Sequence, residues 1–370
     1  MSVADYQAQA IKNTAPTYLK GAIDNTVREW YLFKFIENAG KVKKKFGGYD
    51  TNWLIKAKRP GIYTTRGERP QFVESDLNES LTISRARMEG VDKISRDTLS
   101  VNRGESQIYD LSEKKVDELV ESMVEAMGHA VYQDASADDS LVAGMDTVFQ
   151  GTVTADTDKV AVPSSGSTYG GKSMVLGALG GNWTANLAAA ERFNSGLTND
   201  WPEGSGDPQY DYLASKMFNY TGNWTPGVTN TWGVNAEKIM RRSAVSINAL
   251  GGTGSAPAVH VLARGMYMDW QDNLTHRERL SIDDYSKSLG FSGVMNFEGA
   301  AVAWDYACPA DSGYGINPKY IELSSNYDDL FFIDGPTWDI TEQAYLMLVG
   351  FHGNFRWNPK YMAKYASFTA

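Results

Sequence analysis

Apolar side chains recur at spacings of three and four in residues 110–136, the strongest hydrophobic pattern in the chain. That spacing places them in one stripe along a helix. The stripe consists of Val116, Leu119, Val120, Met123, Val124, Met127 and Val131. Asp110 and Glu113 form a pattern typical of a capping pair at a helix start. We therefore predict one long amphipathic helix that packs its stripe into a core, with His129 packed beside it.

Residues 51–86 predict an extended hairpin instead. A strand over 53–58 is followed by a turn at Pro60 and Gly61, and a return strand ends over 80–83. Neither strand holds enough apolar residues for a core of its own, and an isolated hairpin is only marginally stable in water. We expect this hairpin to lie on another surface.

The residues before it, 1–50, are typical of an arm rather than a domain. An amphipathic piece over 26–37 carries the aromatic residues Trp30, Tyr31, Phe33 and Phe35. A run of four lysines within residues 41–45 and a Gly-Gly pair follow. We interpret the lysine run as a solvated turn.

Residues 138–300 mix short strands and helices, punctuated by Gly, Ser, Thr and Asn. We expect helices over 182–193, 211–220, 235–249 and 264–274, and strands over 147–152, 159–162 and 258–262. This order is mixed α+β and lacks a regular βαβ alternation.

The tail returns to strands. They are expected over 300–305, 320–324, 329–333 and 341–351. We find no internal repeat and no linker rich in proline or glycine, which suggests that the middle region is inserted into a framework made by the two ends.

Composition narrows the class of protein. The 370 residues are 42% hydrophobic and 22% charged, which is ordinary for a globular protein and excludes wholesale disorder. The net charge of −10 argues against a protein that binds nucleic acid by neutralising phosphates, although a container for DNA needs no such binding. The single cysteine, Cys308, excludes an internal disulfide and fits folding in a reducing cytosol.

No export or membrane segment is predicted. Aromatic residues make up 12% of the chain, and such a content indicates side chains that pack at interfaces between subunits.

One motif suggests nucleotide chemistry. Residues 166–173 read GSTYGGKS, which matches the phosphate-loop pattern G-x-x-x-x-G-K-[ST] that begins at Gly166. In a nucleotide-binding protein the backbone amides would hold the phosphates, Lys172 would reach the terminal ones, and Ser173 would hold magnesium. An apolar strand ending at Asp334 could supply a second magnesium ligand.

The context of the motif favours a glycine-rich surface loop. Residues 163–165 separate it from a short strand, and Gly177, Gly180 and Gly181 would each weaken the following helix by about 1 kcal/mol. The alternating strands and helices of a parallel sheet are missing around it. A P-loop nucleotide hydrolase is therefore kept only as an alternative of another class.

The sequence shows no other set of residues at a spacing typical of a catalytic or metal site. The histidines at 129, 260, 276 and 352 have no neighbours at metal-ligand spacing. Cys308 precedes Pro309 with no histidine nearby. The acidic pairs at 138–139, 283–284 and 328–329 lie in polar connections, where caps and turns explain them. We predict no catalytic, cofactor-binding or metal-ligating residue and no enzymatic activity.

The last seventy residues carry a resemblance. Residues 298–305 read EGAAVAWD, 314–323 read YGINPKYIEL, 338–345 read WDITEQAY, and 353–359 read GNFRWNP. This series resembles the C-terminal end of tailed-bacteriophage major capsid proteins with the Hong Kong 97-like fold. The order of the whole chain is similar to that family as well.

The resemblance implies an α+β fold with five parts. They are an N-terminal arm (1–50), an extended hairpin loop, or E-loop (51–86), a peripheral-domain strand and spine helix (87–137), an axial domain (138–300) and a return to the peripheral domain (301–370).

The resemblance also implies a function in assembly. Copies of the chain would form the hexamers and pentamers of an icosahedral shell, which encloses double-stranded DNA without sequence-specific contacts. The implied partners are a separate scaffolding protein and a portal, with a decoration protein as an optional addition. The implied location is the virion, after assembly in the host cytoplasm. A non-viral nanocompartment shell of the same fold is the alternative within this class.

If the resemblance holds, particular residues lie at or support interfaces between copies. They are Trp30, Phe33, Phe35, Trp53, Ile55, Phe72, Phe332 and Trp338, each with ordinary core packing as the alternative. The loop over 324–339 would make contacts where capsomers meet. Some relatives join subunits through a lysine on the hairpin loop and an asparagine of a neighbour. Lys56 and Lys58 lie in that region, with Asn354 or Asn358 as the partners to consider. Most relatives form no such bond, and no catalytic carboxylate is identifiable here.

Overall fold

The computed structural model describes most of the chain. The described residues are 32, 35–36, 39–45, 47–48, 50–56, 78–96, 105–153, 155–156, 158–175, 179, 187–188, 192–193, 212–213, 215–252, 254–274 and 295–368. Trp30, Phe33, Lys58, Phe72 and His276 lie outside them, as do the Pro60-Gly61 turn and the acidic pair at 283–284. Among the described helices, none is both long enough and apolar enough to cross a membrane.

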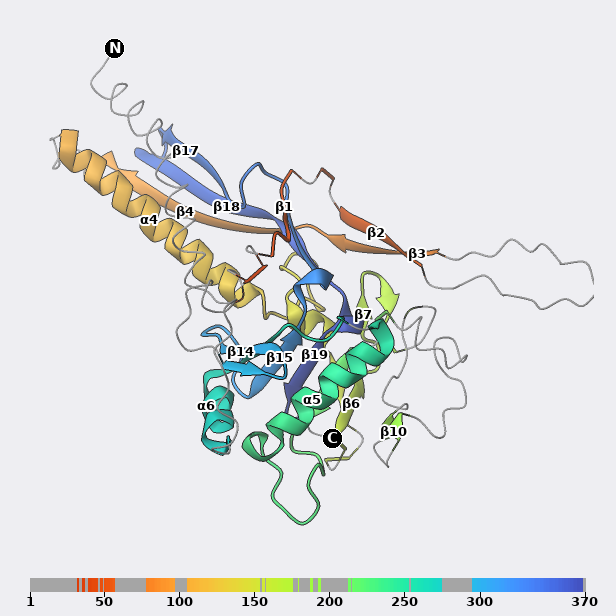
Figure 1. Ribbon diagram of the computed structural model, residues 1–370. Coiled ribbons are helices and arrows are strands. Elements are labelled where there is room, and N and C mark those ends of the chain that lie inside the picture. The colour runs from red at the N-terminus through yellow and green to blue at the C-terminus, as the bar shows by residue number, and fades with distance from the viewer. Residues whose placement is uncertain are drawn as a thin grey trace, which may run out of the picture.

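A five-stranded sheet forms the upper part of the body in Figure 1. Its centre is β18 (Ala344–Trp357), which pairs antiparallel with β4 (Ala86–Ser95) along one edge. Along its other edge β18 pairs with β17 (Phe332–Asp339) and β16 (Ile321–Ser325), and β1 (Val42–Lys43) closes the sheet beside β16.

The long helix α4 (Glu105–Ala130) packs on one face of this sheet. Its predicted stripe is confirmed as buried, with Leu119 partly buried. Gly90 of β4 allows the close approach, because a Cβ there would lie 3.3 Å from Leu119 Cδ1.

The helix begins five residues before Asp110, so the predicted cap at Asp110 and Glu113 is wrong. His129 is exposed and lies edge-on to Tyr306, so its predicted packing is wrong too.

An eight-stranded sheet forms the lower part of the body. Its strands, in spatial order, are β13 (Met295–Phe297), β14 (Ala300–Trp304), β12 (Val259–Leu262), β15 (Ser312–Ile316), β19 (Ala363–Ala366), β11 (Lys216–Asn219), β6 (Val160–Pro163) and β5 (Gly151–Thr152). The helices α5 (Trp232–Gly251) and α6 (Arg264–Asn273) contact each other beside it. Their expected positions at 235–249 and 264–274 are confirmed, as is the strand at 258–262.

The helix expected over 211–220 is wrong, because the segment contains β11. All four residues of β11 are buried, and the strand pairs with β19 and β6 on its two sides. Burial between two strands overrides local propensity here. The helix expected over 182–193 is replaced by the short strands β9 (Leu187–Ala188) and β10 (Arg192–Phe193), and a 3-10 turn, η1 (Met145–Val148), precedes β5.

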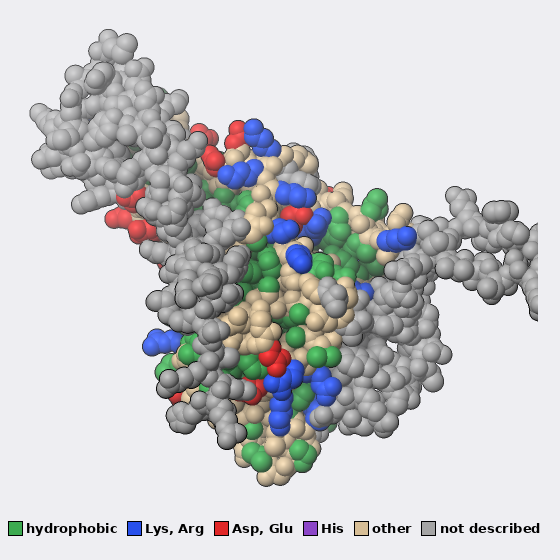
Figure 2. All heavy atoms as spheres, viewed as in Figure 1, with side chains coloured by type: hydrophobic (Ala, Val, Ile, Leu, Met, Phe, Trp, Pro, Cys, Tyr) green, Lys and Arg blue, Asp and Glu red, His purple; other side chains and the backbone are tan. Residues whose placement is uncertain are grey.

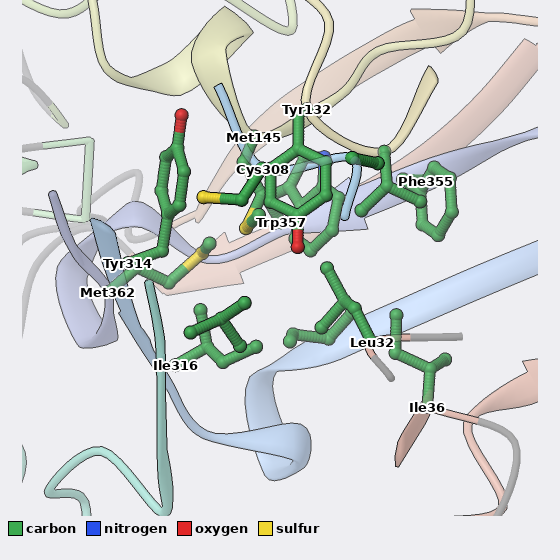
Figure 3. Close-up of a cluster of buried hydrophobic side chains, with 14 of the residues drawn as sticks. Leu32, Ile36, Tyr132, Met145, Cys308, Tyr314, Ile316, Phe355, Trp357 and Met362 are labelled. Atoms are coloured by element: carbon green, nitrogen blue, oxygen red, sulfur yellow. The ribbon is translucent and has the colours of Figure 1, made fainter. Parts of the chain in front are cut away.

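The two sheets share one hydrophobic core (Figure 3). Trp357 and Phe355 from the five-stranded sheet lie near Tyr314 and Ile316 from the eight-stranded sheet, with Leu32 of the N-terminal segment beside them. Apolar burial on this scale, at about 25 cal/mol per Å², is the main stabilising contribution.

The tail divides between the two sheets rather than staying in one. β14, β15 and β19 belong to the eight-stranded sheet, whereas β16, β17 and β18 belong to the other. The boundary predicted at residues 300 and 301 therefore does not coincide with the division between the sheets. β17 begins later than the strand expected over 329–333, and β18 continues past the expected end at 351.

The chain crosses between the sheets through two matching turns. η4 (Pro318–Tyr320) joins β15 to β16, and η5 (Pro359–Tyr361) joins β18 to β19. Each follows an asparagine, so the tetrapeptide Asn-Pro-Lys-Tyr occurs twice, a short repeat that the sequence analysis missed. The rings of Tyr320 and Tyr361 stack with centroids 3.8 Å apart.

Candidate assembly surface

A two-stranded hairpin projects from the body (Figure 1). It consists of β2 (Asp50–Lys56) and β3 (Asn78–Ser84), which pair antiparallel over all seven residues, as the sequence predicted in outline. Burial alternates along both strands. Leu81 on one face is fully buried, whereas Leu54, which belongs to the opposite face, is 74% exposed. Figure 2 shows hydrophobic side chains at the surface where this hairpin leaves the body.

The covered face of the hairpin packs against residues from distant parts of the chain. The Trp53 ring lies 6.2 Å from the Tyr169 ring, and the Arg356 guanidinium lies 5.7 Å from the Trp53 ring centroid. Trp53 and Ile55 are partly buried against the main core. Both residues therefore support the hairpin root within one copy of the chain.

On the face of the five-stranded sheet opposite α4, described aliphatic side chains are exposed. Because successive side chains of a strand alternate between faces, Val91 points away from the helix that Gly90 meets. Val91 is 71% exposed, and its β18 neighbours Leu346 and Leu348 share this face. In the part of the chain that the structure describes, an aliphatic strip on this face is thus exposed at Val91 and Leu346 and half-buried at Leu348.

Aromatic side chains lie at the same sheet. Phe332 is partly buried and stacks on Tyr327 with centroids 4.3 Å apart, and it meets the His352 ring edge-on at 4.7 Å. Trp338 is 39% exposed and meets Tyr345 edge-on. The structure therefore brings Phe332 and Trp338 to one sheet, apart from Trp53 and Ile55 at the hairpin.

Among the predicted interface residues, Phe35 lies in the core of the chain and is 1% exposed. Among the described residues, the most exposed large apolar side chains are ones that the sequence analysis missed: Ile340, Leu54, Tyr306 and Val91. For Leu54 a signal existed. It lies in phase with Asn52 and Lys56 along the strand, which marks it as an apolar residue on a polar face.

Lys43, Lys44 and Lys45 of the lysine run are exposed, as the prediction of a solvated run implies, and each also lies near a carboxylate. β1 pairs parallel with β16, and Lys43 Nζ lies 2.8 Å from the largely buried carboxylate of Glu322. Lys44 and Lys45 lie 3.7 and 3.2 Å from Asp329 and Asp328. The β1–β16 pairing and the Lys43–Glu322 pair thus hold this segment at the edge of the five-stranded sheet, whereas the exposed pairs of Lys44 and Lys45 contribute little.

The segment that matched the phosphate-loop pattern is a β-hairpin. β7 (Thr168–Tyr169) pairs antiparallel with β8 (Lys172–Ser173), and Gly170 and Gly171 form the turn with φ of +59° and +75°. Consecutive positive φ values suit a two-residue hairpin turn, not a loop that opens a helix. Lys172 Nζ lies 2.6 Å from Glu79 Oε2 of β3. The strand-loop-helix geometry required for nucleotide binding is therefore contradicted.

The buried ionisable groups have structural partners. Burial raises the pKa of Cys308 well above its usual range, so the thiol stays protonated and unreactive. Burial lowers the pKa of His260 to about 4, and Tyr365 Oη lies 2.9 Å from its Nδ1. Burial also raises the pKa of Asp305, which accepts hydrogen bonds from Tyr132 Oη and from the Leu32 amide. Among the described residues, no group of three or more His, Cys, Asp or Glu side chains could hold a metal ion.

The asparagines proposed for cross-linking are internal. Asn354 is 3% exposed; its Oδ1 accepts from the Ala143 amide at 2.8 Å and its Nδ2 donates to the Ser84 carbonyl at 2.8 Å. The side-chain oxygen of Asn358 is buried as well. Lys56 is exposed at the end of β2. Asn354 therefore serves to join β18 to the root of the hairpin within one chain.

Comparison with known proteins identifies the fold. No family model and no curated protein sequence matches the chain. The capsid asymmetric unit of cyanophage A-1(L) matches with a TM-score of 0.52 at 12% identity, over 89% of this chain and 90% of that one. The capsid of a native GTA particle matches with a TM-score of 0.51 at 9% identity, over 91% and 90%. These two sheets, the long helix and the projecting hairpin together make the Hong Kong 97-like capsid fold, as the resemblance implied.

Proposed function

We propose that the chain is the major capsid protein of a tailed phage, which forms hexamers and pentamers of an icosahedral shell around double-stranded DNA. The observation that carries the proposal is the projecting hairpin, whose open face exposes Leu54 on a capsid fold. A bare two-stranded hairpin gains stability when a neighbouring subunit covers it.

The parts of the fold take corresponding roles in this proposal. The five-stranded sheet with α4 is the peripheral domain, the eight-stranded sheet with α5 and α6 is the axial domain, and β2–β3 is the stem of the E-loop. The open strip at Val91 and Leu346, and the partly exposed Trp338, face neighbouring copies. A separate scaffolding protein, a portal and an optional decoration protein complete the assembly in the host cytoplasm.

The charge of the chain suits a container. The exposed side of α4 carries Glu118, Glu121 and Glu125, and the chain as a whole has a net charge of −10. Such a surface does not attract phosphate groups, so the enclosed DNA remains unattached and can leave the shell. The role is structural and requires no catalysis.

Assembly of the purified protein tests the proposal. We would examine the chain alone and with a scaffolding partner by electron microscopy and mass photometry, and expect closed shells or rings of five and six copies. Leu54→Asp should abolish them. Asn52→Asp, which adds the same charge to the same open face without removing an apolar contact, should retain them. A wild-type chain that stays monomeric with the scaffolding partner would overturn the proposal.

A further inference from the structure

The β7–β8 hairpin, which carries the phosphate-loop-like sequence, contacts the root of the projecting hairpin. We propose that it is a clamp that sets the angle at which β2–β3 leaves the body, with Gly170 and Lys172 as its positioning residues. This inference rests on the proposed assembly function, because the angle matters where the hairpin meets another copy.

The first contact of the clamp is made by the backbone. The Thr82 amide of β3 donates to the Gly170 carbonyl at 3.2 Å. Gly170 has a φ of +59°, and a Cβ at this position would lie 2.8 Å from Leu81 Cβ. Since Leu81 is fully buried, it cannot move aside cheaply. Only glycine lets β3 lie this close.

The second contact lies further along β3. Lys172 Nζ reaches Glu79 Oε2 at 2.6 Å, and both side chains are partly exposed. Residues 79 and 82 are about 10 Å apart along a strand that rises ~3.3 Å per residue. One contact would fix only the position of the strand. Two contacts at this separation also fix its direction.

The clamp is itself fastened to the body. Tyr169 is 3% exposed, and its hydroxyl accepts a hydrogen bond from the Trp357 amide at 2.9 Å. A cavity of about 260 Å³ lies beside this root, lined among others by Thr82, Gly170 and Asn354. Because the root is not packed solidly on that side, the clamp contacts and Asn354 restrain the hairpin there.

Leverage makes the restraint important. Leu54 lies four residues, or about 13 Å, from the start of β2 at Asp50, so a rotation of about 10° there moves Leu54 by about 2 Å. A gap of only 0.5–1 Å already removes roughly a quarter to a half of a van der Waals contact. The clamp therefore decides whether Leu54 meets its partner surface.

Two neighbouring glycines provide the sharpest test. Gly170 and Gly171 both have positive φ, so Ala at either position introduces similar backbone strain, but only Ala at 170 meets Leu81. We would measure hydrogen exchange of residues 50–56 and 78–84 in the unassembled chain. Gly170→Ala should raise exchange there about tenfold over Gly171→Ala and should reduce closed particles. Equal exchange and equal assembly of the two variants would overturn the clamp.

A charge exchange tests the second contact. Lys172→Glu and Glu79→Lys should each raise exchange of β2–β3 by about two- to five-fold, the range for a partly exposed ion pair. The double variant should return it to the wild-type rate. Failure of that rescue would remove Lys172 from the clamp. If wild-type chains assemble but the exchange tests give no difference between variants, the clamp is rejected and the assembly function stands. If the wild-type chain binds ATP in calorimetry and Lys172→Ala abolishes that binding, the motif binds nucleotide and the clamp is wrong.

Discussion

Two antiparallel strand pairs of this protein obtain their stability in different ways. β4 and β18 pair over ten residues, and α4 covers one face of the pair. β2 and β3 pair over seven residues, but their open face is bare and their other face is covered at the root. The same ladder of hydrogen bonds thus occurs once within the folded core and once in a projecting element with one face exposed to solvent.

The largest expected effect on the free energy of unfolding comes from truncating an apolar side chain that packs on β4–β18, compared with one on β2–β3. Met123 is 4% exposed beneath β4, so Met123→Ala should lower the free energy of unfolding by about 2–5 kcal/mol. Leu54→Ala should change it by less than about 0.5 kcal/mol, because this side chain is exposed, while weakening assembly. Denaturant titration and particle counts measure both. A large loss of stability in Leu54→Ala would show that the hairpin is covered within one chain.

Removing the Asn354 side chain, which connects β18 to β3, should have the next largest effect on the free energy of unfolding. Each buried group left without its hydrogen bond costs about 1–3 kcal/mol, so Asn354→Ala should cost at least about 2 kcal/mol and loosen β3 in hydrogen exchange. Asn358→Ala is the control. Its buried side-chain oxygen has no partner among the described residues, so removing it should cost less than half as much. Equal losses would contradict the assigned role of Asn354.

A change of pH should act on the body rather than on the hairpin. The pKa of His260 falls from 6.5 to about 4 on folding, so the unfolded chain binds more protons between these values. Stability should therefore decline as the pH falls from 6.5 to 4, by about 3 kcal/mol at ~1.36 kcal/mol per unit. His260→Gln should lack this component.

Thermal unfolding of the wild type and of His260→Gln between pH 6.5 and 4 measures the contribution of His260 to stability directly. Asp305, whose pKa burial raises, acts with the opposite sign and cancels in the comparison. Parallel profiles for the wild type and His260→Gln would contradict the assignment.

The smallest effect on stability is expected from removing an exposed ion pair on the five-stranded sheet. Lys93 Nζ lies 2.7 Å from Glu342 Oε2, but both side chains are more than half exposed. Lys93→Ala should leave the thermal midpoint unchanged within error, since exposed ion pairs contribute little. Hydrogen exchange of β2–β3 should also stay unchanged, in contrast to Lys172→Glu at the hairpin root.

The sequence predicted most reliably where one local pattern decides the structure. The stripe of α4 and the existence of the β2–β3 hairpin belong to this kind. It failed at β11, where Met217 and Phe218 are buried because β19 and β6, far away in sequence, lie on both sides. The context of the phosphate-loop motif argued correctly against a strand-loop-helix, but the pairing of Lys172 with Glu79 was not predictable, because it is set by the fold and not by the motif.

The assembly surface was predictable only in part. Trp53 and Phe332 were identified by their aromatic character, which indicates burial but does not say whether the covering atoms belong to the same chain. Phe35 shows the difference, because its cover comes from its own chain. Leu54 could have been found from its phase with Asn52 and Lys56.

The paired Asn-Pro-Lys-Tyr turns have a mechanical consequence. They carry the chain from one sheet to the other and back, and their stacked tyrosines place the two passages side by side. Tyr320 also contacts Ser255 at 2.9 Å, just beyond the end of α5. A single connection would leave the chain free to rotate about one crossing point. Two adjacent connections joined by stacked rings restrain that rotation, so the crossing resists torsion between the sheets in addition to their shared core.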